Sequence, residues 1–322
     1  MRSGAILAAA LAVCISASAA SAQSYPQRTV KFILPFGPAS GTDITARLVA
    51  DRLAARWGKP AVIENRPGGD GLVAINAFIA ANDDHTLLWV PVGTFAVHPY
   101  EKDKLPYDAE QDLLPISNVT SLFLAATTSN GMNAGSLRDL VSVLRANPDK
   151  FNWAAANGNA DFLMSGFLKS NNLQVAKTPY RDILQAPNDL AENRIQLLSS
   201  SLAIVTPLMQ AGKVKVLAVT GRQRAPSAPD VPTVREAGFP ALEMESIGGI
   251  FGPRGMPLAL REQIAADVRA AVAGDANIAS RLQATGQVID IRGPAEFAAG
   301  IKELREQLDG IAKVLGMKAA TR

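Results

Sequence analysis

Apolar runs alternate along this chain with segments whose apolar residues recur at helical spacing. Short runs rich in β-branched residues and bounded by Gly, Pro or Asp are typical of buried strands, and recurrence every three or four positions predicts amphipathic helices. The predicted strands are residues 30–36, 61–64, 87–91, 116–128, 151–156, 175–180, 195–199, 214–220 and 246–251. Strands separated by helices predict an α/β fold with mostly parallel sheets flanked by helices on both faces.

Two of the helix starts carry clear local signals. Ser40 and Asp43 have the spacing of a capping box, and so do Ser136 and Asp139, each pair preceding an apolar stripe. Two or three helices are predicted to close the chain, the last beginning at Pro294, since Pro is favoured at the first helical position. Further helices are predicted at residues 162–168 and 203–210.

The N-terminal segment has the pattern of a secretory signal peptide covering residues 1–22. Arg2 supplies the positive start, and the apolar run 5–15 is 11 residues long, shorter than the roughly 20 needed to span a bilayer. Ala20-Ser21-Ala22 fits the small-x-small cleavage site before Gln23. The mature chain is therefore expected in an exported compartment; a buried first helix is the alternative.

Composition limits the class of protein. With 322 residues the chain suggests two domains or one large domain. An apolar fraction of 48% excludes a disordered protein, and a net charge of +3 without a Lys/Arg cluster excludes a strongly basic nucleic-acid binder. Signal-peptide cleavage would remove Cys14, the single cysteine, which excludes a Cys nucleophile. Lipid attachment at Cys14 is an alternative that the bulky Val13 disfavours.

Ligands of open α/β sheets bind beyond the carboxyl ends of the strands, which directs attention to the loops there. A Gly- and Ser-containing loop that begins a helix leaves backbone N–H groups free for a carboxylate or phosphate, although such residues can also merely cap the helix. No loop has the Lys of a P-loop, which argues against nucleotide phosphate. The candidate binding residues are Gly37, Pro38, Ser40, Gly41, Thr42, Gly93, Thr94, Phe95, Asn157, Gly158, Asn159, Asp161, Arg181, Asp182, Ser200 and Ser201.

Enzyme motifs are missing from the sequence. There is no G-x-S-x-G, H-E-x-x-H or C-x-x-C, and only two histidines occur. His85, in the polar turn 83–85, is expected to be solvated, and His98 is expected to pack in a loop. A Ser40–His98 dyad in a secreted hydrolase is the enzymatic alternative, but it has no assignable acid partner. We predict no enzyme activity, no cofactor and no metal site.

A family resemblance emerges from several segments taken together. Residues 35–43, Pro-Phe-Gly-Pro-Ala-Ser-Gly-Thr-Asp, correspond to a segment of pattern Pro-Phe-x-Pro-Gly-Gly-x-x-Asp, with Ala-Ser in place of Gly-Gly. Residues 229–238, Pro-Asp-Val-Pro-Thr-Val-Arg-Glu-Ala-Gly, are the most distinctive run. The remaining matching segments are 62–68, 104–108, 178–181, 210–213 and 217–220. The chain thus resembles the periplasmic solute-binding receptors of tripartite tricarboxylate transporters, often called the Bug family.

This resemblance implies a two-domain periplasmic binding protein fold of type II-like architecture, with a ligand cleft between the lobes. Residues 23–124 plus 246–322 would form lobe 1, and residues 125–245 lobe 2. A monomeric receptor would close on a small organic acid and deliver it to membrane permease subunits; signalling to a membrane sensor is the alternative. Family loops hold one carboxylate through backbone N–H groups, hydroxyls and waters, which carries over to Gly37, Pro38, Ser40, Gly41, Thr42, Asn157, Gly158 and Asn159.

The chain also departs from the family pattern. The family's Gly-x-Gly-Ser/Thr-x-x-His is replaced by 157–164, without hydroxyl or His, and its Tyr-Lys-Gly by 180–182. An ionised Asp161 or Asp182 beside the ligand would repel a second carboxylate by on the order of a few kcal/mol at an effective dielectric of about 20. We therefore hypothesise a ligand other than a simple small dicarboxylate, with an ammonium, hydroxyls or an aromatic part contacted by Phe95 and Phe162.

Overall fold

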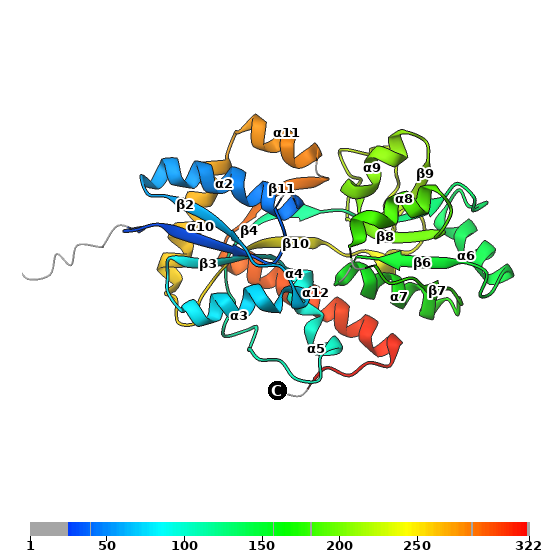
Figure 1. Cartoon of the computed structure of the whole chain (residues 1–322), viewed down its shortest axis with the longest axis horizontal. Helices are drawn as coiled ribbons and strands as arrows, with labels where there is room; N and C mark the ends of the chain where they lie inside the picture. Colours follow the sequence, from blue (N-terminus) through cyan, green and yellow to red (C-terminus); the bar gives the residue numbers. More distant parts are fainter. Residues whose placement is uncertain (1–24, 39, 157, 181, 285, 321–322) are drawn as a thin grey trace, which may run out of the picture.

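The computed structural model describes residues 25–320 apart from 39, 157, 181 and 285. Two sheets, each flanked by helices, form two lobes that lie side by side (Figure 1). The six-stranded sheet of lobe 1 has the order β11-β4-β10-β3-β1-β2, and the five-stranded sheet of lobe 2 the order β7-β6-β8-β5-β9. The predicted signal peptide, 1–22, lies outside the described residues.

Lobe 1 takes its elements from both ends of the chain. Its strands are β1 (Val30–Leu34), β2 (Ala61–Asn65), β3 (Thr86–Pro91), β4 (Leu114–Leu122), β10 (Ser246–Gly252) and β11 (Gln287–Arg292). Its helices are α2 (Gly41–Trp57), η1 (Gly69–Gly71), α3 (Leu72–Ala81), α4 (Val92–Ala96), α5 (His98–Glu101), α10 (Leu258–Val272), α11 (Ala276–Ala284) and α12 (Pro294–Leu315).

Lobe 2 is built from the middle of the chain. Its strands are β5 (Leu124–Ser129), β6 (Asn152–Ala155), β7 (Ala176–Lys177), β8 (Leu197–Ser201) and β9 (Val214–Val219). Its helices are α6 (Leu137–Ala146), α7 (Asn159–Ser170), η2 (Ile183–Gln185), α8 (Ala186–Ala191) and α9 (Leu202–Gln210), and η3 (Pro240–Leu242) lies on the return path to lobe 1.

Both sheets are mixed rather than mostly parallel, which corrects the expectation from the strand–helix alternation. In lobe 1, β1 pairs in parallel with β2 and β3, whereas β10 is antiparallel to β3 and β4, and β11 is antiparallel to β4. In lobe 2, β6 is parallel to β7 and β8, but β5 is antiparallel to β8 and β9. Strand β10 returns from lobe 2 with only the short η3 between β9 and it, and it enters the lobe 1 sheet between β3 and β4, antiparallel to both.

One predicted strand proves to be the crossing itself. The apolar run 116–128 is broken at Phe123 into β4 and β5, which belong to different sheets. At the end of β4, Leu122 pairs with both Ser246 and Gln287, the first residues of β10 and β11. A single residue separates β4 from β5. The strand ends of the lobe 1 sheet near Leu122 therefore face the strand ends of the lobe 2 sheet where Leu124 pairs with Ser201.

The carboxyl ends of the parallel strands lie where the two sheets face each other. Pro91, which ends β3, pairs with Gly248 near the start of β10, and β1 runs parallel to β3. In lobe 2, β6 runs parallel to β8, so both end beside the crossing. The loops after β1, β3, β6 and β8 therefore all point to the junction of the lobes.

The hydrophobic core is continuous between the lobes on one side of the molecule. One cluster of buried side chains includes Phe167 of α7 and Phe297 of α12. Helix α12, red in Figure 1, runs beneath both lobes and packs on α7, where a Cβ on Gly166 would lie 2.7 Å from Cγ2 of Ile311. Among the described residues, no helix is long and apolar enough to cross a membrane.

Candidate ligand-binding site

The loop between β1 and α2 is held firmly at the end of its strand. The Asp43 N–H donates to Ser40 Oγ at 3.2 Å, which confirms the cap predicted from the sequence. The Asp43 carboxylate, 2% exposed, accepts from Arg47 at 3.0 Å and from Asn65 Nδ2 at 2.8 Å. Asn65 Nδ2 also donates to the Phe36 carbonyl at 2.9 Å. These bonds fix the position of the first turn of α2.

A second pair of loops brings the two lobes into contact. A Cβ on Gly93, in α4 of lobe 1, would lie 2.6 Å from Oδ1 of Asn159, at the start of α7 in lobe 2. A Cβ on Gly158, which has φ +87°, would lie 3.0 Å from the Gly93 carbonyl oxygen. Asn159 Nδ2 donates to Ser246 Oγ at 3.4 Å. The two lobes approach so closely here that position 93 has no room for a side chain.

A third contact joins the start of α9 to lobe 1. Ser201 caps α9 by accepting from the Ala203 N–H at 3.3 Å. Gly286, with φ +65°, lies so close that a Cβ there would be 2.9 Å from the Ala203 nitrogen. The neighbouring Gln287 donates from Nε2 to the Gly41 carbonyl at 3.1 Å. The first turns of α2 and α9 are thereby connected through residues 286–287.

Three helix N-termini thus gather where the lobes meet, those of α2, α7 and α9. The first turn of a helix presents N–H groups that lack intrahelical partners, together with the positive end of the helix dipole, and both suit an anion, above all a carboxylate. The intervening segments 93–94, 158–159 and 200–202 carry no charged side chain. The geometry therefore favours holding an acid through backbone and hydroxyl groups, without ion pairing.

Not every candidate residue offers its side chain to this junction. Ser200 is fully buried, and its hydroxyl donates to the Ser201 carbonyl at 3.3 Å. Asn157 and Arg181 lie outside the described residues. Pro38 is exposed and Gly37 half-buried, in the loop before the Ser40 cap.

The two carboxylates that motivated an unusual ligand have other roles. Asp161 forms an ion pair with Lys177 and accepts from Ser165 Oγ at 3.3 Å. Asp182 is exposed and caps η2 by accepting from the Leu184 N–H at 3.0 Å. Pairing offsets the charge of Asp161, and solvent screens that of Asp182. Neither carboxylate therefore counts against a simple dicarboxylate as the ligand.

The two aromatic side chains expected to contact the ligand are buried in the core of this structure. The side chain of Phe95 is 1% exposed and packs edge-to-face on Phe251, with ring centroids 5.4 Å apart. Phe162 is 4% exposed and packs on Tyr100 at 5.5 Å. Both rings belong to the same cluster of buried side chains. Only the backbone of Phe95 remains near the junction.

His98 does not serve as a catalytic base in this structure. It is fully buried, and its Nε2 lies 2.9 Å from the Asp70 carbonyl while Nδ1 lies 2.8 Å from Tyr107 Oη. Because a carbonyl only accepts, Nε2 carries the proton and Nδ1 accepts from the tyrosine. Burial lowers the pKa of His98, so the ring stays neutral. With Ser40 engaged as a helix cap, the proposed dyad is not assembled.

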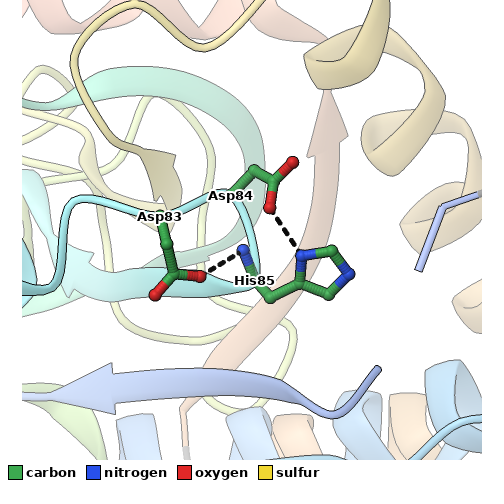
Figure 2. A group of neighbouring side chains, drawn as sticks. All are labelled: Asp83, Asp84 and His85. Atoms are coloured by element: carbon green, nitrogen blue, oxygen red, sulfur yellow. Dashed lines mark hydrogen bonds and ion pairs between the residues drawn. The ribbon is translucent and has the colours of Figure 1, made fainter. Parts of the chain in front are cut away.

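His85 is buried rather than solvated, which corrects the prediction for the turn 83–85. Figure 2 shows its Nδ1 directed at Asp84 Oδ1, 2.5 Å away, and its backbone N–H bonded to Asp83 at 2.8 Å. The Gln27 N–H donates to Nε2 at 3.1 Å, and the Tyr25 ring lies 4.9 Å from the imidazole. No local sequence signal predicts that residues 25–27 cover this turn.

The same turn resembles a metal site by composition. One ligand atom each of Asp83, Asp84 and His85 lies within 4.8 Å of the others. Asp83, however, accepts from Thr86 Oγ1 at 2.8 Å and from Arg28 at 2.9 Å, and both ring nitrogens of His85 are bonded within the fold. A guanidinium on the carboxylate disfavours a cation, so we interpret the cluster as a turn that holds the N-terminal segment.

Gln287 is the residue of the junction that sequence reasoning missed. The β-branched run Val288, Ile289 and Ile291 indicates a strand at β11 and could have located the element. The role of Gln287 itself depends on a partner 246 residues away, for which no local signal exists.

Comparison with known proteins identifies the family. Residues 45–289 match the family described as Tripartite tricarboxylate transporter family receptor. Protein BugT of Bordetella pertussis is 28% identical over 243 residues, covering 74% of this chain and 74% of BugT.

Two solved structures from Rhodopseudomonas palustris share the fold. MatC (Rpa3494) with bound malate has a TM-score of 0.77 and 26% identity, covering 89% of this chain and 99% of that chain. Rpa4515 with adipate has a TM-score of 0.78 and 26% identity, covering 92% of this chain and 100% of that chain. The chain described here belongs to the tripartite tricarboxylate transporter receptor family.

Proposed function

We propose that this protein is a periplasmic solute-binding protein that captures a small organic acid between its lobes and delivers it to the permease subunits of a tripartite tricarboxylate-type transporter. The observation that carries the proposal is the convergence of the first turns of α2, α7 and α9 at the lobe junction. Family membership and the malate and adipate seen in the two R. palustris proteins support it.

Binding would use backbone groups rather than ion pairs. An acid placed between the lobes meets N–H groups from both sides, and lobe closure excludes water, which strengthens each contact. Affinity then follows from contacts that exist only in the closed state, so ligand shifts an open–closed equilibrium. The proposed contacts are Gly37, Pro38, Ser40, Gly41, Thr42, Gly93, Thr94, the Phe95 backbone, Asn157, Gly158, Asn159 and Ser201.

The ligand class we propose is a small dicarboxylate. Malate and adipate are both dicarboxylates, and in this chain the acidic residue nearest the start of α7, Asp161, is paired with Lys177. A second ligand carboxylate therefore meets no unpaired Asp161. Chemistry on the ligand is not part of the proposal, because the Ser40–His98 dyad is not assembled.

The organisation expected from the sequence is part of the same proposal. Lobe 1 would comprise residues 23–124 plus 246–322 and lobe 2 residues 125–245. Sheet membership supports these limits to within one residue, since Leu124 is the first residue of β5 in the lobe 2 sheet. The mature protein would be a periplasmic monomer, released after cleavage near Ala22. It would need no cofactor, metal or nucleic acid.

Isothermal titration calorimetry of the mature protein tests the proposal. The panel comprises malate, succinate, adipate, citrate, acetate and a neutral amino acid. Binding of at least one dicarboxylate, with acetate at least tenfold weaker, is expected, because one carboxylate uses a part of the junction only. Binding of the amino acid alone, or of no acid, would contradict it.

Uptake measurements separate transport from signalling. Cells lacking this chain should lose uptake of the labelled acid, and adding the chain back should restore it. If uptake is unchanged while transcription responds to the acid, the receptor signals to a membrane sensor instead.

A further inference from the structure

We propose that Gln287 is a positioning residue of the binding site, which holds the first turn of α2 in register with the first turn of α9. The proposal rests on the proposed function, since it names a residue that sets the affinity of the same junction. Gln287 begins β11, an edge strand, and no ligand contact of its own is needed.

The side-chain amide of Gln287 is buried against α2. The residue is 5% exposed, and its Nε2 donates to the Gly41 carbonyl at 3.1 Å. Its Oε1 accepts from Thr45 Oγ1 at 3.2 Å, and Thr45 is 1% exposed. An amide is suited to this place because it donates to a carbonyl and accepts from a hydroxyl at the same time.

The fit is tight enough to restrict the neighbouring residue. A Cβ on Gly41 would lie 3.2 Å from Gln287 Nε2, closer than side chains ordinarily pack. Glycine at position 41 and glutamine at position 287 therefore belong together, although 246 residues separate them. A buried amide in this position orders the turn that presents the N–H groups of α2 to an acid.

The residue before Gln287 carries the same constraint to the other lobe. Gly286 has φ +65°, a conformation that L-residues rarely adopt, and a Cβ there would be 2.9 Å from the Ala203 nitrogen and 3.0 Å from the Ala203 Cβ. Its backbone consequently rests on the first turn of α9. Residues 286–287 thus contact the first turn of α2 in lobe 1 and the first turn of α9 in lobe 2, and they set the relative position of these two turns at the proposed site.

Replacing the amide separates packing from charge. Gln287→Ala removes both hydrogen bonds, and we expect the affinity for the best-binding dicarboxylate to fall roughly tenfold. Gln287→Glu keeps the shape, loses the donor to Gly41 and adds a negative charge beside the acid, so a further loss of roughly tenfold is expected at low salt. The difference in acid affinity between the two variants should decrease as ionic strength rises, because salt screens the repulsion between the acid and the negative charge that Gln287→Glu introduces.

The control is the same pair of changes at Gln263, an exposed residue of α10. Gln263→Ala and Gln263→Glu should leave affinity within twofold of wild type at every salt concentration. If Gln287 only stabilised the fold, Gln287→Ala would lower the free energy of unfolding and leave the acid affinity of the folded protein at the wild-type value. That result would overturn the proposal.

Amide hydrogen exchange of the ligand-free protein tests the positioning role of Gln287 independently of acid binding. In Gln287→Ala the amides of residues 42–44 should exchange faster, whereas those of the α6 start, 138–140, should not change. If wild type binds no acid, the proposed function fails, and unchanged exchange in residues 42–44 would separately show that Gln287 does not hold the turn.

Discussion

The two ends of the lobe 1 sheet differ in the residues that they concentrate and in what those residues do. At the amino end of β3, the turn 83–85 gathers two carboxylates and an imidazole beside Tyr25 and Arg28. At the opposite end, the loops after β1 and β3 offer glycine, serine and threonine, with α2 capped by Ser40. Side chains that often perform chemistry lie at the first end, but they bond to one another.

This difference teaches that polar side chains bonded to one another hold the fold together in the turn 83–85, whereas the proposed binding site uses N–H groups at helix starts. In the turn 83–85, each ligand-like atom already has a partner in the fold, and the result is an anchor for residues 25–28. At the junction, helix starts of one lobe lie against residues of the other lobe. Changes at the junction should therefore alter affinity, and changes at the turn should alter stability.

The largest loss of acid affinity is expected from adding a side chain at Gly93. Gly93→Val would place side-chain atoms on Asn159, since even a Cβ lies 2.6 Å from its Oδ1. The lobes should be wedged apart, and dicarboxylate affinity should fall about 100-fold, or ~2.7 kcal/mol. Gly310→Val is the matched control, because nothing lies within 4 Å of that Cβ position.

Removing the obstructing side chain tests the cause. In the double variant Gly93→Val/Asn159→Ala, about tenfold of the lost affinity should return, which calorimetric titration of all four proteins in the cycle would measure. Additive losses in the double variant would show that Gly93 acts in some other way.

An intermediate effect is expected from the helix cap at the junction. Ser40→Ala and Ser136→Ala remove equivalent caps, which accept from Asp43 N–H at 3.2 Å and Asp139 N–H at 3.1 Å. Each should lower the free energy of unfolding by ~1 kcal/mol. Only Ser40→Ala should also weaken acid binding, by about fivefold, because α6 starts elsewhere. Equal affinities in the two variants would contradict a site at α2.

At the turn 83–85, stability rather than affinity should change. Burial disfavours an ionised Asp83, but the hydrogen bonds from Thr86, the His85 N–H and Arg28 outweigh it and hold the pKa below its ordinary value. Asp83→Asn should lower the free energy of unfolding at pH 7 by ~1 kcal/mol with unchanged acid affinity.

The pH dependence of that difference has a definite sign. A carboxyl whose pKa is lowered in the folded state stabilises the fold above its unfolded pKa, about 4, and loses this contribution as pH falls through the folded pKa. The stability gap between wild type and Asp83→Asn should therefore shrink below about pH 4. Urea titrations at pH 7, 5 and 3 measure it; a gap that widens in acid would refute this assignment.

The smallest effect is expected from Tyr25→Phe. The hydroxyl donates to the Asp84 carbonyl at 3.0 Å, whereas the ring, edge-on to Trp57 at 5.7 Å, is retained. A loss of ~0.5–1 kcal/mol in unfolding free energy is expected from one hydrogen bond. Reduced acid affinity in this variant would mean that the two ends of the sheet are coupled.

Local signals in the sequence predicted much of this fold. The caps at Ser40 and Ser136 are confirmed, because a helix start is decided by residues within one turn. The strand–loop–helix pattern also placed Gly41, Gly93 and Gly158 at strand ends, and these ends lie at the lobe junction. Their role in binding stays a prediction.

What could not be predicted depends on partners remote in sequence. His85 was expected in solvent, but Tyr25 and Gln27 cover it from 58 residues and more away. Phe95 was expected to face the ligand, and Phe251 draws its ring into the core instead. Gln287 was not singled out, because its bond to Gly41 exists only once β11 is beside α2. The periodicity of one sequence predicts its helices and strands, but it does not predict which distant segments pack against each other.

Hydrogen exchange with and without the best-binding dicarboxylate tests directly where the acid is held. Bound acid should slow exchange at the first turns of α2, α7 and α9, in residues 42–44, 160–162 and 203–205. The turn 83–85 should exchange equally in both states. Protection confined to the turn 83–85, or none at these three helix starts, would contradict the binding site described here.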